Sequence, residues 1–297
     1  KARANRTVVV VGAGPAGLEA ARVAAERGHR VVLFESSDRT GGQINIAAKG
    51  GWRESLSGIP RWLDQQVRKL GVDLRLNMTA TPKDVLDEKP DVVVVATGGL
   101  PNKGRFKGAE LAASTWDILT GAVAPAENVL LFDDHGEHQA PSAAESMAKR
   151  GSRVEYVTPD RMALPRIGYN NFQIHMRELH KAGVVFTPDT RLVQAYREGN
   201  RLVVVLKDDY TDEQEERIVD QLVAEHGTLP RDELYFALKP LSSNRGEIDP
   251  DAFAQGLPQT VATNPGGAFQ LFRVGDAIAS RNIHAAIHDS LRLAKDF

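Results

Sequence analysis

Residues 7–17 decide the fold and read Thr7-Val8-Val9-Val10-Val11-Gly12-Ala13-Gly14-Pro15-Ala16-Gly17. Four consecutive valines do not alternate with polar residues. They therefore predict a strand buried on both faces, as in a parallel sheet covered by helices. The pattern Gly12-x-Gly14-x-x-Gly17 follows at once, and an alanine-rich helix is expected from about Pro15 to Arg27. The stretch predicts a strand, a tight turn and a closely packed helix.

The three glycines have separate roles when such a turn holds a dinucleotide. Gly12 permits the turn, Gly14 keeps side-chain atoms away from a pyrophosphate, and Gly17 lets the helix approach the strand. A second apolar strand, 31–34, ends at Glu35, which lies 18 positions after Gly17. An acid there accepts hydrogen bonds from a ribose and repels a 2′-phosphate, which favours FAD or NAD. The alternative is an ordinary βαβ unit without a ligand.

Composition limits the remaining classes of function. A chain of 297 residues suits two domains, and 42% hydrophobic with 26% charged residues is typical of a globular protein. The net charge of -2 gives no reason to expect nucleic acid or a membrane surface. The chain has no apolar run long enough for a membrane span, and residues 1–6 lack the apolar core of a signal peptide. We therefore expect a cytoplasmic protein.

Cysteine is absent from the sequence. This excludes disulfides, thiolate metal sites and a cysteine-ligated iron–sulfur cluster within the chain. It also excludes the Cys-x-x-Cys pair of disulfide-reducing flavoenzymes. Electrons that reach a flavin here must pass to another group.

Five further stretches suggest a dinucleotide site. The glycine pair before Gln43 follows the acid of the second strand, and a buried strand at 91–95 runs into Ala96-Thr97-Gly98-Gly99. Residues 78–81, which include Ala80, are expected near an adenine. A strand at 270–274 ends in Gly275-Asp276, and a helix beginning near Ile283 directs N–H groups at a flavin or a pyrophosphate. Together they predict the two-dinucleotide flavoprotein architecture.

A second βαβ unit is expected from strand 128–132, helix 142–150 and strand 152–157. Its turn, 133–141, has one glycine among acids and histidines, which weakens an NADH site. A metal site is the alternative for this turn, but we favour a solvated loop and expect no metal there or at His284 and His288. Further strands are expected at 192–196, 202–206 and 218–224. No acid clearly ends strand 152–157, so NADH and NADPH are not distinguished.

Three stretches carry a resemblance to a known family: 10–21, Gly41-Gly42-Gln43-Ile44-Asn45-Ile46-Ala47, and Arg273-Val274-Gly275-Asp276-Ala277. The sequence resembles the C-terminal half of the NADH:flavin oxidoreductases, which include 2,4-dienoyl-CoA reductase, trimethylamine and histamine dehydrogenases and betaine-type N-demethylases. In that family a TIM barrel with FMN and an iron–sulfur cluster precedes this module. The chain has neither the length nor the cysteines for those parts. The resemblance therefore implies a barrel domain or subunit as partner, and we expect an oligomer.

The resemblance also implies the ligand and its site. FAD would bind, with NAD(P)H or the partner's FMN and iron–sulfur centre exchanging electrons with it, while the alternative is a non-redox module that holds only ADP. No catalytic acid or base is expected from the chain. The substrate, and whether the chain is part of a longer polypeptide, are not decided by the sequence. The candidate cofactor-binding residues are Gly12, Gly14, Pro15, Ala16, Gly17, Glu35, Ser36, Gly42, Gln43, Ala80, Thr97, Gly98, Gly275, Asp276 and Ile283.

The fold class expected is α/β, with two Rossmann-like dinucleotide-binding domains, the second inserted in the first. We assign residues 1–125 and 250–297 to the FAD-binding or ADP-binding domain. Residues 126–249 are assigned to an inserted domain that resembles an NAD(P)-binding one. The alanine- and proline-rich loop at 122–127 is expected to be the crossing between them.

Overall fold

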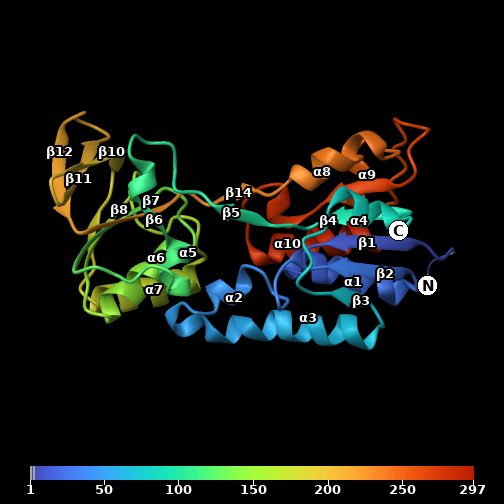
Figure 1. Ribbon diagram of the computed structural model, residues 1–297. Coiled ribbons are helices and arrows are strands. Elements are labelled where there is room, and N and C mark those ends of the chain that lie inside the picture. Colours follow the sequence, from blue (N-terminus) through green and yellow to red (C-terminus); the bar gives the residue numbers. More distant parts are fainter. Residues whose placement is uncertain (1, 3) are drawn as a thin grey trace. The chain divides into compact units, whose positions relative to one another are not determined.

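Two compact units make up the protein in the computed structural model, which describes residue 2 and residues 4–297 (Figure 1). Unit 1 contains the residues up to Asn45, Leu56–Leu100 and Thr228–Phe297, and unit 2 contains Ile46–Ser55 and Pro101–Gly227. Each unit is built on a five-stranded sheet. Lys1 and Arg3, part of the stretch judged for a signal peptide, lie outside the described residues.

Unit 1 has a parallel sheet in the order β15-β4-β1-β2-β3. Its strands are β1 (Thr7–Val11), β2 (Arg30–Phe34), β3 (Asp73–Arg75), β4 (Val92–Val95) and β15 (Gln270–Arg273). Its helices are α1 (Pro15–Arg27), α3 (Gly58–Lys69), α4 (Pro82–Asp87), α8 (Glu233–Leu238), α9 (Pro250–Gln255) and α10 (Ile283–Ala294). The chain crosses from one unit to the other within α2 (Ile44–Ala47), within β5 (Gly99–Pro101) and just before β14 (Thr228–Pro230). β5 and β14 form a two-stranded sheet.

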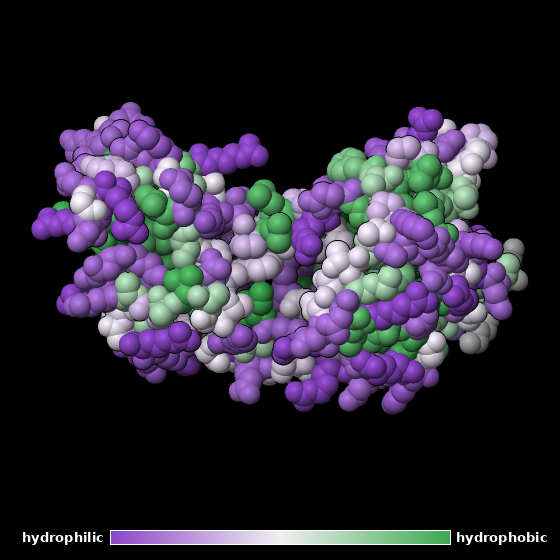
Figure 2. Space-filling view, in the orientation of Figure 1, coloured by the Kyte–Doolittle hydropathy of each residue, from purple (hydrophilic) through white to green (hydrophobic). Residues whose placement is uncertain are grey.

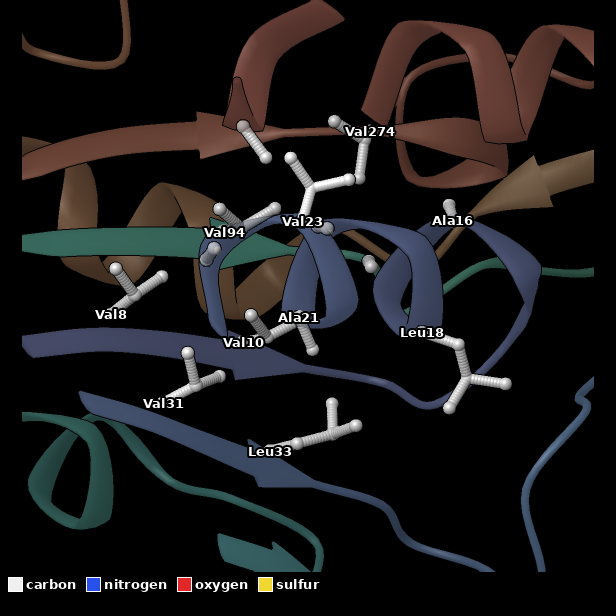
Figure 3. Close-up of a cluster of buried hydrophobic side chains, with 14 of the residues drawn as sticks. Val8, Val10, Ala16, Leu18, Ala21, Val23, Val31, Leu33, Val94 and Val274 are labelled. Atoms are coloured by element: carbon white, nitrogen blue, oxygen red, sulfur yellow. The ribbon is translucent and has the colours of Figure 1, made fainter. Parts of the chain in front are cut away.

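The valines of β1 divide between two hydrophobic clusters. Val8 and Val10 pack with Leu18 of α1 and with residues of α3 and α10, as the close-up in Figure 3 shows in part. Val9 and Val11 belong to a second cluster, which contains residues of α4 and α8. This is why the strand has no polar face: helices cover both sides of the sheet. The sequence prediction of a doubly buried strand is confirmed.

Unit 2 has a parallel sheet in the order β6-β13-β7-β8-β9 and an antiparallel sheet of β10-β11-β12. The parallel strands are β6 (Ala113–Ser114), β7 (Asn128–Asp133), β8 (Arg153–Val157), β9 (Val185–Thr187) and β13 (Gln221–Glu225). The antiparallel strands are β10 (Thr190–Glu198), β11 (Arg201–Asp208) and β12 (Gln214–Val219), and the helices are α5 (Thr115–Thr120), α6 (Gln139–Lys149) and α7 (Tyr169–Lys181).

The two faces of strand β7 have different coverings. Val129 and Leu131 pack with α5, α6 and α7, whereas Leu130 and Phe132 pack with the antiparallel sheet. A helical layer and a sheet layer therefore enclose the parallel sheet of unit 2. Hydrophilic side chains dominate the visible surface of both units, which is expected when the apolar residues are used inside (Figure 2).

The strand expected at 218–224 is two strands. β12 ends at Val219 and pairs with β11, whereas β13 begins at Gln221 and pairs with β7. Asp220 lies between them, and its carboxylate accepts hydrogen bonds from the backbone N–H and the side-chain amide of Asn128, at 2.9 and 2.8 Å. The apolar run spans a change of sheet, which periodicity within the run does not reveal.

The limits of the compact units fall at other residues than the expected domain limits. Residues 101–125 pack in unit 2 because β6 adds to its sheet, beside β13. Residues 228–249 pack in unit 1, where Tyr235 and Leu238 join the core and Asn244 bonds to Leu271. The functional assignment of 1–125 with 250–297, and of 126–249, stays a prediction.

Glycine is required where β1, α1 and β4 come together. A Cβ on Gly12, which has a φ of +103°, would lie 2.3 Å from the carbonyl oxygen of Ala96. A Cβ on Gly17 would lie 1.8 Å from the carbonyl oxygen of Gly12. Both contacts are with backbone atoms, which cannot rotate away. The two glycines therefore set how closely the helix and the neighbouring strand approach the turn.

We expect Gly17→Ala to lower the free energy of unfolding by about 3 kcal/mol or more, because the added methyl group must displace the backbone of Gly12. Urea unfolding followed by circular dichroism measures this change. Gly58→Ala at the start of α3 is the control, since its Cβ meets no described atom within 4 Å. Equal stabilities for the two variants would contradict the close approach.

Candidate functional site

The candidate residues of unit 1 gather at one edge of its sheet. Gly12 follows β1, Glu35 follows β2, Thr97 comes two residues after β4, and Gly275 comes two residues after β15. All of these strands run parallel, so their carboxyl ends share an edge. Ligands of open parallel sheets bind at this edge, where the strand order reverses.

The turn after β1 leaves space for a ligand at Gly14. This residue has an ordinary extended backbone, with φ -71° and ψ -178°, and an added Cβ would meet no described atom within 4 Å. Gly14 is also the N-cap of α1 and supplies no side-chain cap, so the first N–H groups of the helix are not capped by their own N-cap residue. Such a helix end attracts a phosphate through its N–H groups and its partial positive charge.

Glu35 lies beside this turn. Its side chain is 7% exposed, and Oε2 accepts a hydrogen bond from the backbone N–H of Ala13 at 2.7 Å. Oε1 accepts from the backbone N–H of Ser37 at 2.8 Å and from the hydroxyl of Ser36 at 3.3 Å. The acid is thus fixed next to the turn after β1, the position predicted for a ribose acceptor, and Ser36 helps to hold it.

Residues far apart in the sequence meet around Asp276. Its Oδ2 accepts hydrogen bonds from the Gln43 side-chain amide at 3.0 Å and from the hydroxyl of Thr228 at 3.1 Å, and Oδ1 accepts from the backbone N–H of Arg281 at 3.3 Å. A Cβ on Gly98 would lie 3.6 Å from the same Gln43 amide. The structure therefore brings together three predicted site residues.

Thr228 is the member of this group that the sequence analysis missed as a site residue. It begins β14, just after the stretch 225–227 of unit 2. The signal was weak: residues 225–230 resemble the Ala-Thr-Gly turn at 96–98 without repeating it. Its place 48 residues before Asp276 is set by the fold and by no local pattern.

The other candidates have less direct places. A Cβ on Gly42 would lie 3.1 Å from the Cα of Gly14, and a Cβ on Gly275 would lie 3.0 Å from the Cβ of Ala16, so these residues border the turn. Pro15 is the first residue of α1, and the Thr97 hydroxyl donates to the carbonyl of Arg231. Ala80 packs against the hydrophobic core, and Ile283 begins α10 after the N-cap Asn282. The role of these residues in binding stays a prediction.

The turn after β7 in unit 2 differs from the solvated loop that the sequence suggested. Asp133 is fully buried: its Oδ1 accepts hydrogen bonds from the backbone N–H groups of His135 and Gly136, both at 3.0 Å, and Oδ2 accepts from the hydroxyl of Tyr156. Glu225, at the end of β13, is 3% exposed and accepts from the Thr115 hydroxyl and the N–H of Gly227. Asp133 and Glu225, at the ends of their strands, are therefore structural acids, whereas Asp134 in the loop is exposed.

A histidine pair also belongs to this loop. His138 Nδ1 and His175 Nε2 are 3.0 Å apart, and His175 packs edge-on against Trp52. Burial lowers the pKa of His138 to about 4 and that of His175 to about 3, so both rings are neutral near pH 7. In residues 2 and 4–297, no three histidine or acidic side chains converge as a metal site.

Burial also shifts the two acids. It raises the pKa of Asp133 to about 6, against the hydrogen bond from Tyr156, and it raises the pKa of Glu225 to about 8, against the hydrogen bond from Thr115. The native state therefore holds a proton on Glu225 over a pH range in which the unfolded chain has released it, since the ordinary value is 4.5. The stability that this acid contributes is present below about pH 4.5 and is lost as the pH rises towards 8.

We predict that Glu225→Gln removes this pH dependence. Between pH 5 and 8 the difference in unfolding free energy between variant and wild type should change by up to about 1.4 kcal/mol per pH unit in favour of the variant. Urea unfolding in a series of buffers measures it. The His138–His175 pair changes stability with the opposite sign but is present in both proteins, so it cancels. Glu110→Gln, at an exposed position, should keep the wild-type slope. A wild-type slope in Glu225→Gln would contradict the assignment.

Comparison with solved structures defines the class of fold. The chain resembles the thioredoxin reductase of T. acidophilum with a TM-score of 0.68 at 18% identity, over 98% of this chain and 96% of that one. It resembles 2-naphthoyl-CoA reductase with a TM-score of 0.80 at 26% identity, over 100% of this chain and 40% of that one. Residues 10–66, in the region of the first glycine turn, match the family of NAD(P)-binding Rossmann-like domains. The protein has the two-unit α/β fold of flavoprotein reductases, which confirms the predicted fold class.

Relatives in sequence place the chain more closely. It is 50% identical over 297 residues to a probable N-methylproline demethylase of Rhizobium meliloti, covering 100% of this chain and 44% of the relative. It is 47% identical over 305 residues to an N,N-dimethylglycine/sarcosine dehydrogenase of Chromohalobacter salexigens, covering 99% and 44%. A multifunctional alkene reductase/demethylase of Caballeronia cordobensis is 39% identical, again over 99% and 44%.

These relatives are oxidoreductases, and the chain spans less than half of their length. The matched region is their C-terminal part. The chain is therefore a homologue of the dinucleotide-binding module of the NADH:flavin oxidoreductase family, which confirms the resemblance drawn from the sequence. Among the described residues, no helix is both long enough and apolar enough to cross a membrane.

Proposed function

We propose that unit 1 binds FAD and that the chain is the flavin-dependent oxidoreductase module of a larger amine dehydrogenase, demethylase or enoate reductase. The observation that carries the proposal is the turn at Gly14, which is open, beside the buried carboxylate of Glu35. Relatives with demethylase, dehydrogenase and reductase names, all more than twice the length of this chain, support the larger enzyme.

The residues present fit an FAD molecule in four respects. The glycine turn and the first N–H groups of α1 would hold the pyrophosphate, and Glu35 would accept hydrogen bonds from the adenosine ribose. The carboxylate repels a 2′-phosphate, which FAD lacks. Asp276, held by Gln43 and Thr228, offers oxygen acceptors for ribityl hydroxyls, and Gly98 leaves the backbone near Gln43 accessible.

When bound, FAD supplies hydride and single-electron chemistry, and the protein contributes binding and orientation. This chemistry does not demand a general acid or base from the chain, and we assign none. It has no cysteine, so an iron–sulfur cluster and the FMN of the family would belong to a further domain or subunit of the enzyme. The two electrons of a reduced substrate would then pass between that centre, or NAD(P)H, and the flavin of unit 1.

The visible spectrum of the purified protein tests the proposal. A flavin absorption band near ~450 nm, with FAD released on denaturation, supports a redox module. Protein that lacks this band and releases ADP on denaturation would instead be the non-redox module, and protein that binds neither nucleotide would overturn the site.

We predict that Gly14→Val abolishes FAD binding while the protein stays folded. The valine side chain would enter the space over Gly14, from which it would exclude the phosphate. Its Cβ would meet no described atom within 4 Å, and the residue requires no unusual backbone angle. Fluorescence titration of flavin-free protein with FAD should show a loss of affinity of at least about 100-fold, or about 2.8 kcal/mol. Gly58→Ala serves as control and should bind like the wild type. Undiminished affinity in Gly14→Val would contradict the assignment.

A further inference from the structure

Strand register identifies the residues of unit 2 that stand where unit 1 has its binding groups. In unit 1, Val11 pairs with Phe34, so the next residues along the two strands are Gly12 and Glu35. In unit 2, Phe132 pairs with Val157, so the next residues are Asp133 and Thr158. An aspartate thus replaces the glycine of the turn, and a threonine replaces the acid that accepts the ribose.

Asp133 takes the hydrogen-bond donors that a pyrophosphate needs. In a nucleotide-binding turn, backbone N–H groups after the strand point at the phosphate. Here the N–H groups of His135 and Gly136 both donate to Oδ1 of Asp133, at 3.0 Å, and the hydroxyl of Tyr156 donates to Oδ2. The carboxylate is fully buried, so it cannot move out into water to make room for a ligand. The carboxylate of Asp133 therefore accepts the hydrogen bonds that a bound anion would accept in this turn.

The other elements of a dinucleotide site are missing as well. Thr158 is 2% exposed, and its hydroxyl accepts the N–H of Asp160 at 3.2 Å, so no carboxylate at this position awaits a ribose. Helix α6 has Pro141 at its third position, which removes one of the N–H groups of its first turn.

We infer that unit 2 does not bind a nicotinamide dinucleotide, and that Asp133 is the permanent occupant of its phosphate position. This inference rests on the proposed FAD site of unit 1. The flavin there would exchange electrons with a protein-bound redox centre of the larger enzyme, a flavin or a metal cluster, rather than with NAD(P)H. FAD held by unit 1 would accept electrons from that centre together with protons from water, or would give electrons to it, depending on which of the two is reduced.

The first test is a calorimetric titration of Gly14→Val with NADH, and separately with NADPH. This variant closes the site of unit 1, so any saturable binding reports on unit 2. We expect no saturable heat up to about 1 mM, the upper end of ordinary substrate affinities. Saturable binding of either nucleotide would overturn the inference. Because the titration needs no flavin, it is independent of the proposed function, whose own failure is the absence of FAD from the wild-type protein.

The second test uses wild-type protein with bound FAD under exclusion of oxygen. We expect NADH and NADPH to leave the band near ~450 nm unchanged, whereas dithionite bleaches it. Dithionite shows that the flavin is redox-active, so the lack of reaction with NADH is a property of the nucleotide site. Complete bleaching by one equivalent of NADH would overturn the inference.

The third test removes the carboxylate that accepts the two backbone hydrogen bonds. Asp133→Ala exposes the N–H groups of His135 and Gly136 to solutes, so inorganic phosphate should raise the thermal unfolding midpoint of this variant more than that of the wild type. Asp133→Asn, whose amide oxygen can still accept both hydrogen bonds, should behave like the wild type. Equal stabilisation of all three proteins by phosphate would show that the donors are accessible with Asp133 in place, against the inference. If Asp133→Ala does not fold, the two nucleotide titrations decide the question.

Discussion

The structure of unit 1 depends on a backbone contact that excludes every side chain. A Cβ atom on Gly12 would lie 2.3 Å from the carbonyl oxygen of Ala96, and a Cβ atom on Gly17 would lie 1.8 Å from the carbonyl oxygen of Gly12. β4, β1 and α1 can meet only because these atoms are absent. The contact also places the first turn of α1 directly at the carboxyl edge of the sheet. The packing of the unit and its attraction for an anion therefore come from the same few atoms.

The two units use an acid in opposite ways at the same edge. In unit 1, Glu35 takes one N–H of the turn, that of Ala13, and stands beside the open space at Gly14. In unit 2, Asp133 stands in the turn itself and takes two N–H groups of the loop. The two sheets share their topology, but Asp133 ends β7, the central strand of its sheet, whereas Glu35 follows β2, the neighbour of the central strand β1. In the roles that we propose, Glu35 is an acceptor for the ligand, and Asp133 takes the place of a ligand.

Much of unit 1 follows from local sequence, and much of unit 2 does not. The buried valines and the limits of α1, Pro15–Arg27, were predictable because apolar runs and a glycine turn act over a few residues. The contact of Thr228 with Asp276 depends on tertiary packing. Asp133 is buried, although the charged residues around it in the sequence predict an exposed loop. The break at Asp220 was hidden because short apolar stretches, Ile218-Val219 and Leu222-Val223-Ala224, lie on both sides of it, and only the partner strands differ. Local sequence patterns specify helices and strands, but they do not specify which polar side chains become buried.

Backbone N–H groups without an acceptor are costly to bury, and this explains why the turn of unit 2 contains a buried acid. Each backbone N–H left without a partner in the interior costs about 1–3 kcal/mol, so a loop that loses its ligand must supply another acceptor or open to water. Asp133 supplies two such bonds, although its own burial disfavours its charge and raises its pKa to about 6. Unit 1 has no such replacement at Gly14. If unit 1 binds FAD as we propose, the nucleotide stabilises it by about 2.7 kcal/mol at a hundredfold excess over Kd. If unit 2 binds no nucleotide, as we infer, the same ligand leaves its stability unchanged, because the N–H donors of its turn already have Asp133 as their acceptor.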